Sequence, residues 1–170
     1  MADDSLGQKE KIRKILALLE NEHPDAKITL EFSNPLELLV ATILAAQCTD
    51  AKVNQVTRSL FKRFRTPKDY VRADLAEIES QIKPTGYYKE KAKRIRNACG
   101  LLVDQFGSKV PRTMDELVKL PGVARKTANI VLSNAYGIME GIAVDTHVLR
   151  LVGRLGLIKS RPGRKSKPTS

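Results

Sequence analysis

The stretch LPGVARKTANIVLSNAYG, residues 120–137, combines a tight turn with a helix that carries two cations in its first turn. Its apolar residues recur at the spacing of one helix face, and it ends on a glycine, a common helix stop. A helix N-terminus carries partial positive charge, which disfavours cations. Arg125 and Lys126 therefore stand where they do nothing for helix stability, and their presence calls for another explanation.

The residues before this stretch predict a second helix and hence a helical hairpin. Thr113 and Glu116 form a capping-box pair for a helix over 113–119, and the turn PGVA separates it from a helix over 124–136. Backbone N–H groups at the start of the second helix have no partners within the helix, so an anion such as a DNA phosphate fits there. An ordinary helical hairpin with two solvated cations fits the same spacing.

The remainder of the chain also has helical periodicity, and no segment alternates as a strand does. Ser5 with Gln8 predicts a capped first helix. Asn34 with Pro35 predicts the start of another, whose run LELLVATILAAQ is apolar on nearly all sides and so should be central. The other predicted helices start at Asp50 (through Phe64), Thr66-Pro67, Asp74 (ending by Pro84), Tyr87 (ending at Gly107) and Asp145. The predicted fold class is all-α, with eight or nine short helices.

The charge of the chain favours nucleic acid as the partner. Its 170 residues carry a formal net charge of +11 with a pI near 9.8. We find no apolar run of the about 18 residues that span a bilayer, and no apolar signal-peptide core in MADDSLGQKEK. We therefore expect a cytoplasmic, DNA-associated protein that does not bind a membrane.

Cys48 and Cys99 have neither the short spacing nor the nearby histidines of a metal site. We expect buried free thiols and no bound metal. The cluster of Lys89, Lys91, Lys93, Arg94 and Arg96 could contact phosphates or could be the solvated face of a helix.

LPGVARKTANIVLSNAYG followed by IAVDTHVLR resembles the helix-hairpin-helix and aspartate signature of the endonuclease III family, the HhH-GPD DNA glycosylases. The segments FSNPLELLVATILAAQCTD and GYYKEKA resemble that family too, in the same order, so the likeness covers about residues 6–158. The resemblance implies the family's helical bundle and a base-excision DNA glycosylase with AP lyase activity on oxidised pyrimidines in duplex DNA.

The resemblance also implies roles for individual residues. Lys126 matches the nucleophile, whose uncharged amine attacks C1′ of the deoxyribose, and the helix N-terminus and Arg125 both disfavour its charged form. Asp145 matches the carboxylate that stabilises the positive charge developing on the sugar. Periodicity alone allows a solvated lysine at 126, and a simple helix cap at 145. His147 is expected to be structural.

Further matched residues are expected to contact DNA. Gln47 matches the side chain that fills the space left by an extruded nucleotide, and Tyr87 takes the place of an apolar wedge. A hydrogen-bonded turn glutamine and a locally packed tyrosine are the alternatives. The hairpin residues expected to hold a phosphate are Gly122, Val123, Ala124, Arg125 and Thr127.

The chain departs from the family pattern at two places. The second hairpin glycine is Ala124, which should weaken phosphate binding modestly by excluding positive φ and narrowing backbone approach. The family's later helices and its 4Fe–4S cysteines have no counterpart, so we expect a truncated form with no cofactor and an incomplete second lobe. Apolar residues such as Ile12, Ile15, Leu19, Val148 and Val152 would then lack partners, which favours self-association or a complementing chain.

The expected organisation is one glycosylase domain over 1–158 with a basic disordered tail over 159–170. A central lobe over 21–137 contains the hairpin 113–136, while 1–20 and 138–158 belong to the second lobe. A catalytically inactive DNA-binding fragment of the same fold is the alternative function.

Overall fold

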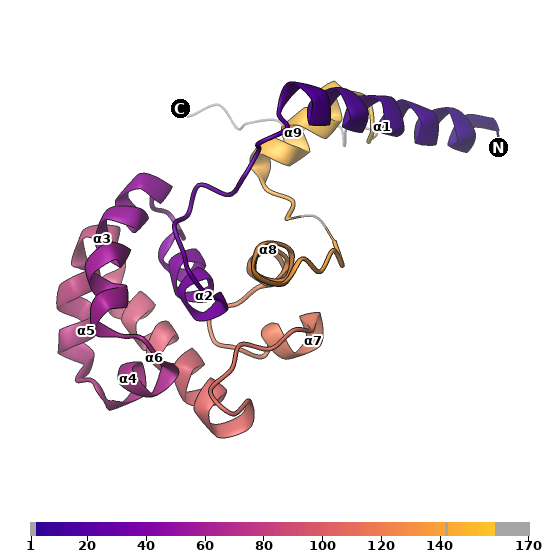
Figure 1. Cartoon of the computed structure of the whole chain (residues 1–170). Helices are drawn as coiled ribbons and strands as arrows, with labels where there is room; N and C mark the ends of the chain where they lie inside the picture. The colour runs from indigo at the N-terminus through magenta and orange to yellow at the C-terminus, as the bar shows by residue number, and fades with distance from the viewer. Residues whose placement is uncertain (1–2, 142, 159–170) are drawn as a thin grey trace, which may run out of the picture. The chain divides into compact units, whose positions relative to one another are not determined.

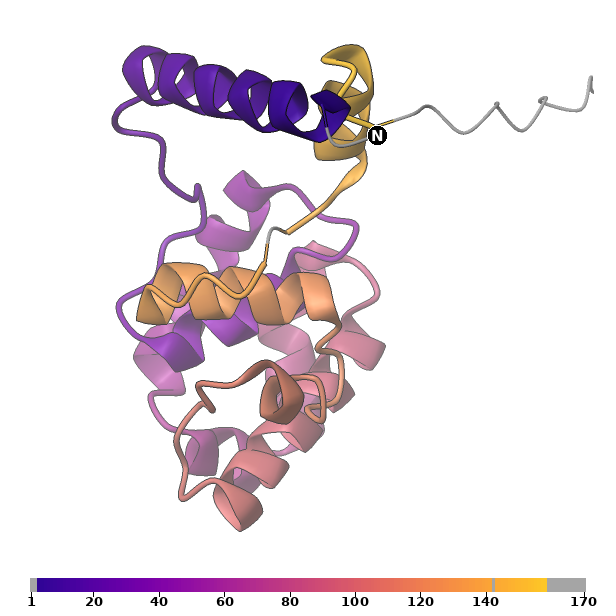
Figure 2. The ribbon, with the colours of Figure 1, turned by 90° about the vertical axis from the view of Figure 1, so that its right-hand side faces the viewer.

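Helices account for the architecture of this chain, as Figures 1 and 2 show. The structure, a computed structural model, describes residues 3–141 and 143–158, and within them we find no strand. The described residues form α1 (Asp3–Glu22), α2 (Pro35–Leu44), α3 (Asp50–Arg63), α4 (Pro67–Arg72), α5 (Leu75–Ile82), the 3-10 turn η1 (Lys83–Thr85), α6 (Tyr88–Gln105), α7 (Met114–Leu117), α8 (Arg125–Tyr136) and α9 (Thr146–Arg154). The prediction of an all-α fold with eight or nine short helices is confirmed. The predicted tail 159–170 lies outside the described residues.

The chain divides into two compact units, one over 28–143 and one made of 1–27 together with 144–170. The larger unit is built around α2, in which eight of the ten residues are buried. Helices α3, α6 and α8 pack against it. Helix α6 also packs against α4 and α5, and the views of Figures 1 and 2 place α8 alongside α2. The predicted central position of the Asn34 helix is therefore confirmed.

Several predicted helix starts are present. The Asn34 side chain accepts a hydrogen bond from the Glu37 N–H at 3.0 Å, with Pro35 as the first helical residue. Thr66 and Asp69 form a capping box at α4. Asp74 stands at the N-cap position of α5 without a side-chain cap hydrogen bond, and α5 ends at Ile82 before Pro84. Local capping chemistry thus determines the starts of α2 and α4.

Other boundaries differ from the prediction. α2 ends at Leu44, and the rest of the run through Gln47 forms a turn in which the Cys48 N–H donates to the Ala45 carbonyl at 3.1 Å. Thr49, rather than Asp50, caps α3, because its hydroxyl accepts from the Lys52 N–H at 3.4 Å.

Two predicted capping boxes are also wrong. α1 begins at Asp3, so Ser5 lies inside the helix. α7 spans only Met114–Leu117 instead of 113–119, because the chain after it tightens into turns that lead to a proline. The Thr113 hydroxyl bonds the Glu116 carboxylate at 2.6 Å and makes no cap to a backbone N–H.

The smaller unit contains α1 and α9. The Gln8 side-chain amide donates to the Leu157 carbonyl at 2.8 Å and so links the two segments. No described residue of α9 is buried. Large apolar side chains of this unit are exposed, among them Ile12, Leu16, Leu18, Leu19, Leu149 and Leu151. The predicted partner for this apolar surface stays a prediction.

The turn between α7 and α8 requires a glycine. The Val123 N–H donates to the Leu120 carbonyl at 3.0 Å, which closes a β-turn with Pro121 at its second position. Gly122 at the third position has φ +84°, a conformation that side chains disfavour. A Cβ there would lie 3.2 Å from Cβ and Cδ of Arg94 on α6. The close approach of α6 and the turn thus fixes where α8 begins.

Replacing Gly122 by alanine should destabilise the protein by about 1–3 kcal/mol, because the residue must keep a positive φ beside Arg94. The matched control is Gly100→Ala in α6, where an added Cβ meets no atom within 4 Å and φ is not positive. That control should raise stability by about 0.5–1 kcal/mol, since alanine favours helix over glycine. Urea unfolding of both variants measures the difference, and equal free energies of unfolding for the two would contradict this account of the turn.

Candidate nucleic-acid interface and active site

The hairpin leads directly into the N-terminus of α8, where the candidate nucleophile lies. Arg125, Lys126 and Thr127 are the first three helical residues. The first intrahelical bond is donated by the Ala128 N–H to the Ala124 carbonyl at 2.9 Å. The N–H groups of Arg125, Lys126 and Thr127 come before it and have no acceptor within the helix, so they can donate to an anion.

Packing decides which side chains of this turn face outward. Ala128, Val131 and Leu132 of α8 are buried, and α8 packs by this face against α2. Arg125 and Lys126 are exposed, as the helical periodicity predicts. The buried face thus orients the cationic first turn toward solvent.

The hairpin residues themselves divide by role. Val123 is buried and its N–H is engaged in the turn, so it anchors the hairpin in the core. Ala124 has φ −90° in an extended conformation, which any residue adopts. The predicted loss from excluding positive φ at Ala124 is therefore wrong, and only the methyl group's steric effect on phosphate approach stays a prediction. Gly122 is exposed and lies where the backbone turns.

Asp145 is held as the N-cap of α9. Its carboxylate Oδ1 accepts from the Val148 N–H at 2.8 Å, so the capping role expected from sequence is present. Lys126 belongs to the unit over 28–143 and Asp145 to the other unit. The approach of the lysine amine to this carboxylate stays a prediction.

Gln47 and Tyr87 share an unusual backbone conformation. Gln47 has φ +54° in the turn after α2, and Tyr87 has φ +47° as the N-cap of α6. Only Ser108 joins them as a non-glycine residue with positive φ among the described residues. Both are exposed, Tyr87 at 70%. Such conformations cost energy and concentrate at functional sites.

One member of the predicted basic cluster lies in the interior. Lys91 is 3% exposed, and its ammonium group donates to the carbonyls of Leu44 and Thr85, each at 2.8 Å. Both alternatives predicted for the cluster, phosphate contacts and a solvated helix face, are therefore wrong for Lys91. The sequence held a signal for this, because Lys91 shares a helix face with the buried residues Ile95 and Ala98.

The other members of that cluster are exposed. Lys89, Lys93, Arg94 and Arg96 face solvent along α6. Lys93 lies 3.7 Å from the Glu90 carboxylate in an exposed ion pair, which contributes little to stability. Arg94 packs over the hairpin glycine, and Arg96 lines a shallow hollow that also includes Pro121. These exposed cations can contribute to an electrostatic surface for DNA.

The two cysteines differ in burial. Cys99 is buried, which raises the pKa of its thiol to about 12 and keeps it protonated. Cys48 is only half-buried, so the expectation of two buried thiols holds for Cys99 alone. Among the described residues we find no group of three or more metal-ligating side chains. His147 is exposed, with a ring nitrogen 3.2 Å from Arg150 Nη2.

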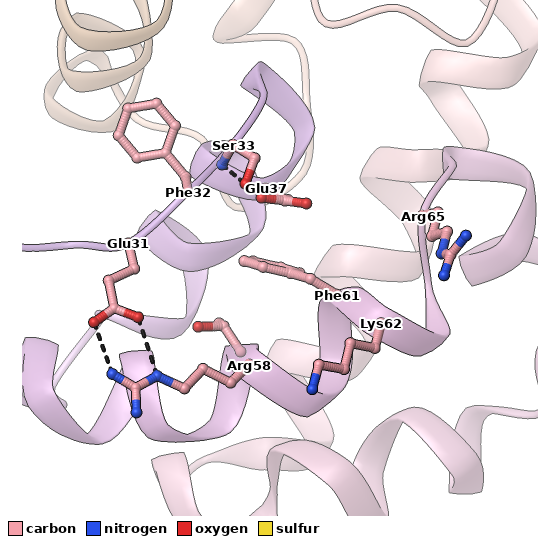
Figure 3. A pocket seen from close by; sticks show the side chains of 9 residues that line it. Glu31, Phe32, Ser33, Glu37, Arg58, Phe61, Lys62 and Arg65 are labelled. Carbon is pink, nitrogen blue, oxygen red and sulfur yellow. Dashed lines mark hydrogen bonds and ion pairs between the residues drawn. The ribbon is translucent and has the colours of Figure 1, made fainter.

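A separate hollow of about 420 Å³ lies between the segment before α2 and helix α3 (Figure 3). Arg58 donates to both carboxylate oxygens of Glu31 at 2.9 and 3.1 Å, and the Ser33 N–H donates to Glu37. The Arg58 guanidinium lowers the pKa of Glu31. None of the predicted site residues lines this hollow.

No helix in the part of the chain that the structure describes is long and apolar enough to cross a membrane.

Comparison with known proteins bears directly on this hairpin. The family model described as "HhH-GPD superfamily base excision DNA repair protein" matches residues 40–168. Endonuclease III of Synechocystis sp. is 49% identical over 153 residues, which cover 90% of this chain and 70% of that protein. Endonuclease III of Bacillus subtilis is 51% identical over 136 residues, which cover 80% of this chain and 62% of that protein.

Solved structures show the same likeness. A structure titled as a non-covalent endonuclease III–DNA complex superimposes with a TM-score of 0.83 at 50% identity, covering 89% of this chain and 70% of that one. A trapped endonuclease III–DNA covalent intermediate matches equally well. A thermostable thymine-DNA glycosylase, at 20% identity and a TM-score of 0.78, shares the fold. The chain belongs to the endonuclease III family of HhH-GPD base excision DNA repair proteins.

Proposed function

We propose that this chain acts in base excision repair as a DNA glycosylase with AP lyase activity on oxidised pyrimidines in duplex DNA. The observation that carries the proposal is the match, at 50% sequence identity, to a structure titled as a trapped endonuclease III–DNA covalent intermediate. In this chain, an exposed lysine stands at the matching hairpin helix, in the first turn of α8.

The proposed chemistry uses the amine of Lys126. The uncharged amine attacks C1′ of the deoxyribose, the bond between C1′ and the damaged base breaks, and the base departs with its bonding electrons. The C1′–O4′ bond then opens, with a proton passing from the nitrogen to O4′, which gives the Schiff base. Loss of a C2′ proton from this Schiff base expels the 3′ phosphate by β-elimination and breaks the strand on the 3′ side. The Asp145 carboxylate stabilises the positive charge that develops on the sugar and assists proton transfers at the amine.

Binding of DNA is proposed to begin at the hairpin. A phosphate placed against the N–H groups at the start of α8 accepts hydrogen bonds there and offsets the field that disfavours Arg125 and Lys126. Gln47 and Tyr87 are proposed to enter the duplex when the damaged nucleotide is turned out, which the inaccessibility of C1′ inside the stack requires. The net charge of +11 supports long-range attraction of the duplex.

Replacing Lys126 by alanine should abolish the covalent adduct formed when the protein is reduced with borohydride on an abasic duplex, because the amine that forms the Schiff base is gone. The control is Lys119→Ala, an exposed lysine on the other side of the same turn, which should keep the adduct. Electrophoresis under denaturing conditions measures the product. Salt-sensitive binding by the unsubstituted chain with no adduct would favour the inactive DNA-binding fragment instead.

Replacing Asp145 by asparagine should slow base release by at least about a hundredfold, because the charge is lost. Thermal stability should hardly change, since asparagine caps a helix as well as aspartate does. Asp74→Asn, at the N-cap position of α5 where the side chain makes no cap hydrogen bond, is the control for loss of a carboxylate charge elsewhere and should leave the rate unchanged. Single-turnover kinetics and melting curves give the two readouts, and an undiminished rate in the Asp145 variant would rule out its role in charge stabilisation.

A further inference from the structure

Lys91 is the buried cation that the proposed chemistry does not use. Placing an ammonium group where it is 3% exposed is costly, and an apolar side chain of similar length would fill the same space more cheaply. Burial lowers the pKa of Lys91. Both the charged and the neutral amine have enough N–H groups to donate to two carbonyls. The cost suggests that the position of those two carbonyls matters.

The two acceptors belong to different parts of the chain. The Leu44 carbonyl is at the last residue of α2, where helix geometry leaves carbonyls without internal partners. The Thr85 carbonyl is at the end of η1, and Thr85 is 2% exposed. One nitrogen atom within 2.8 Å of both oxygens holds these two backbone segments at a fixed spacing.

Each acceptor lies two or three residues before one of the two exposed non-glycine residues that have positive φ among the described residues. Gln47 comes three residues after Leu44, and Tyr87 two residues after Thr85. The intervening segments are short turns, in which the Cys48 N–H donates to Ala45 and the Gly86 N–H donates to Lys83. The amine of Lys91 therefore joins the bases of the two turns that present Gln47 and Tyr87.

We propose that Lys91 is a positioning residue that fixes the spacing between the Gln47 and Tyr87 turns, so that both side chains enter an opened duplex together. This inference rests on the proposed function. A displacement near 1 Å of groups that hold a reacting substrate can lower a rate by roughly a hundredfold, so a fixed spacing here has a measurable consequence.

The test uses two variants of Lys91 and an abasic duplex with 2-aminopurine facing the lesion. Fluorescence of that base reports its unstacking by an inserted side chain, and strand cleavage under single-turnover conditions reports the rate. Lys91→Met removes both hydrogen bonds. Lys91→Arg keeps a donating cation but forces the carbonyls apart, and it remains available if the methionine variant does not fold.

In protein that is folded by circular dichroism and saturating on DNA, each Lys91 variant should lose at least about half of the fluorescence increase and cleave roughly ten- to a hundredfold more slowly. Lys68→Met and Lys68→Arg, at an exposed site on α4, should match the unsubstituted protein. A purely structural role would lower the melting temperature but leave the fluorescence at saturation unchanged.

The outcomes separate the two proposals. If the unsubstituted chain forms no borohydride adduct, the proposed function fails and this inference fails with it. If the adduct forms and a folded Lys91 variant keeps both the fluorescence increase and the cleavage rate, the proposed function stands and the positioning role of Lys91 is overturned.

Discussion

The packing of α8 against α2 is the constraint on which the candidate site depends. Ala128, Val131 and Leu132 are buried, so the helix can take only one rotation about its axis. That rotation leaves Arg125 and Lys126 exposed in the first turn. The β-turn at Gly122, held against Arg94, then determines where the first turn begins. The core and the turn together thus place two cations at a helix N-terminus, a position that disfavours positive charge.

The proposed phosphate and the proposed nucleophile use the same feature in different ways. The N–H groups that the helix cannot pair internally can donate to a phosphate, and the exposed first turn presents the proposed nucleophile beside them. The alanine at position 124 adopts its backbone conformation without strain, because that backbone is extended with φ −90°. A hairpin with one glycine, at 122, is sufficient for the turn. Within the turn, the unusual conformation is the positive φ of Gly122, and a glycine adopts it easily because it has no side chain.

Sequence predicted the fold and the placement of the hairpin because both depend on local chemistry. Caps at Asn34 and Asp145 are read from single side chains, and the buried face of α8 from its periodicity. The end of α2 before Gln47 was not predicted because the run LELLVATILAAQ favours helix throughout. Where α2 ends depends instead on the contacts that start α3. The burial of Lys91 was not predicted because a lysine in a basic cluster is usually exposed, although its place on the helix face of Ile95 and Ala98 indicated burial. Its pairing with the Leu44 carbonyl, 47 residues away, has no local signature.

The central claim is that the amine of Lys126 bonds covalently to the sugar. Its most direct test is peptide mapping by mass spectrometry of the borohydride-reduced adduct between the unsubstituted protein and an abasic oligonucleotide. The account predicts a single modified residue, with the mass of the sugar remnant on Lys126. The same mass on another amine, such as Lys119 or the N-terminus, would contradict it.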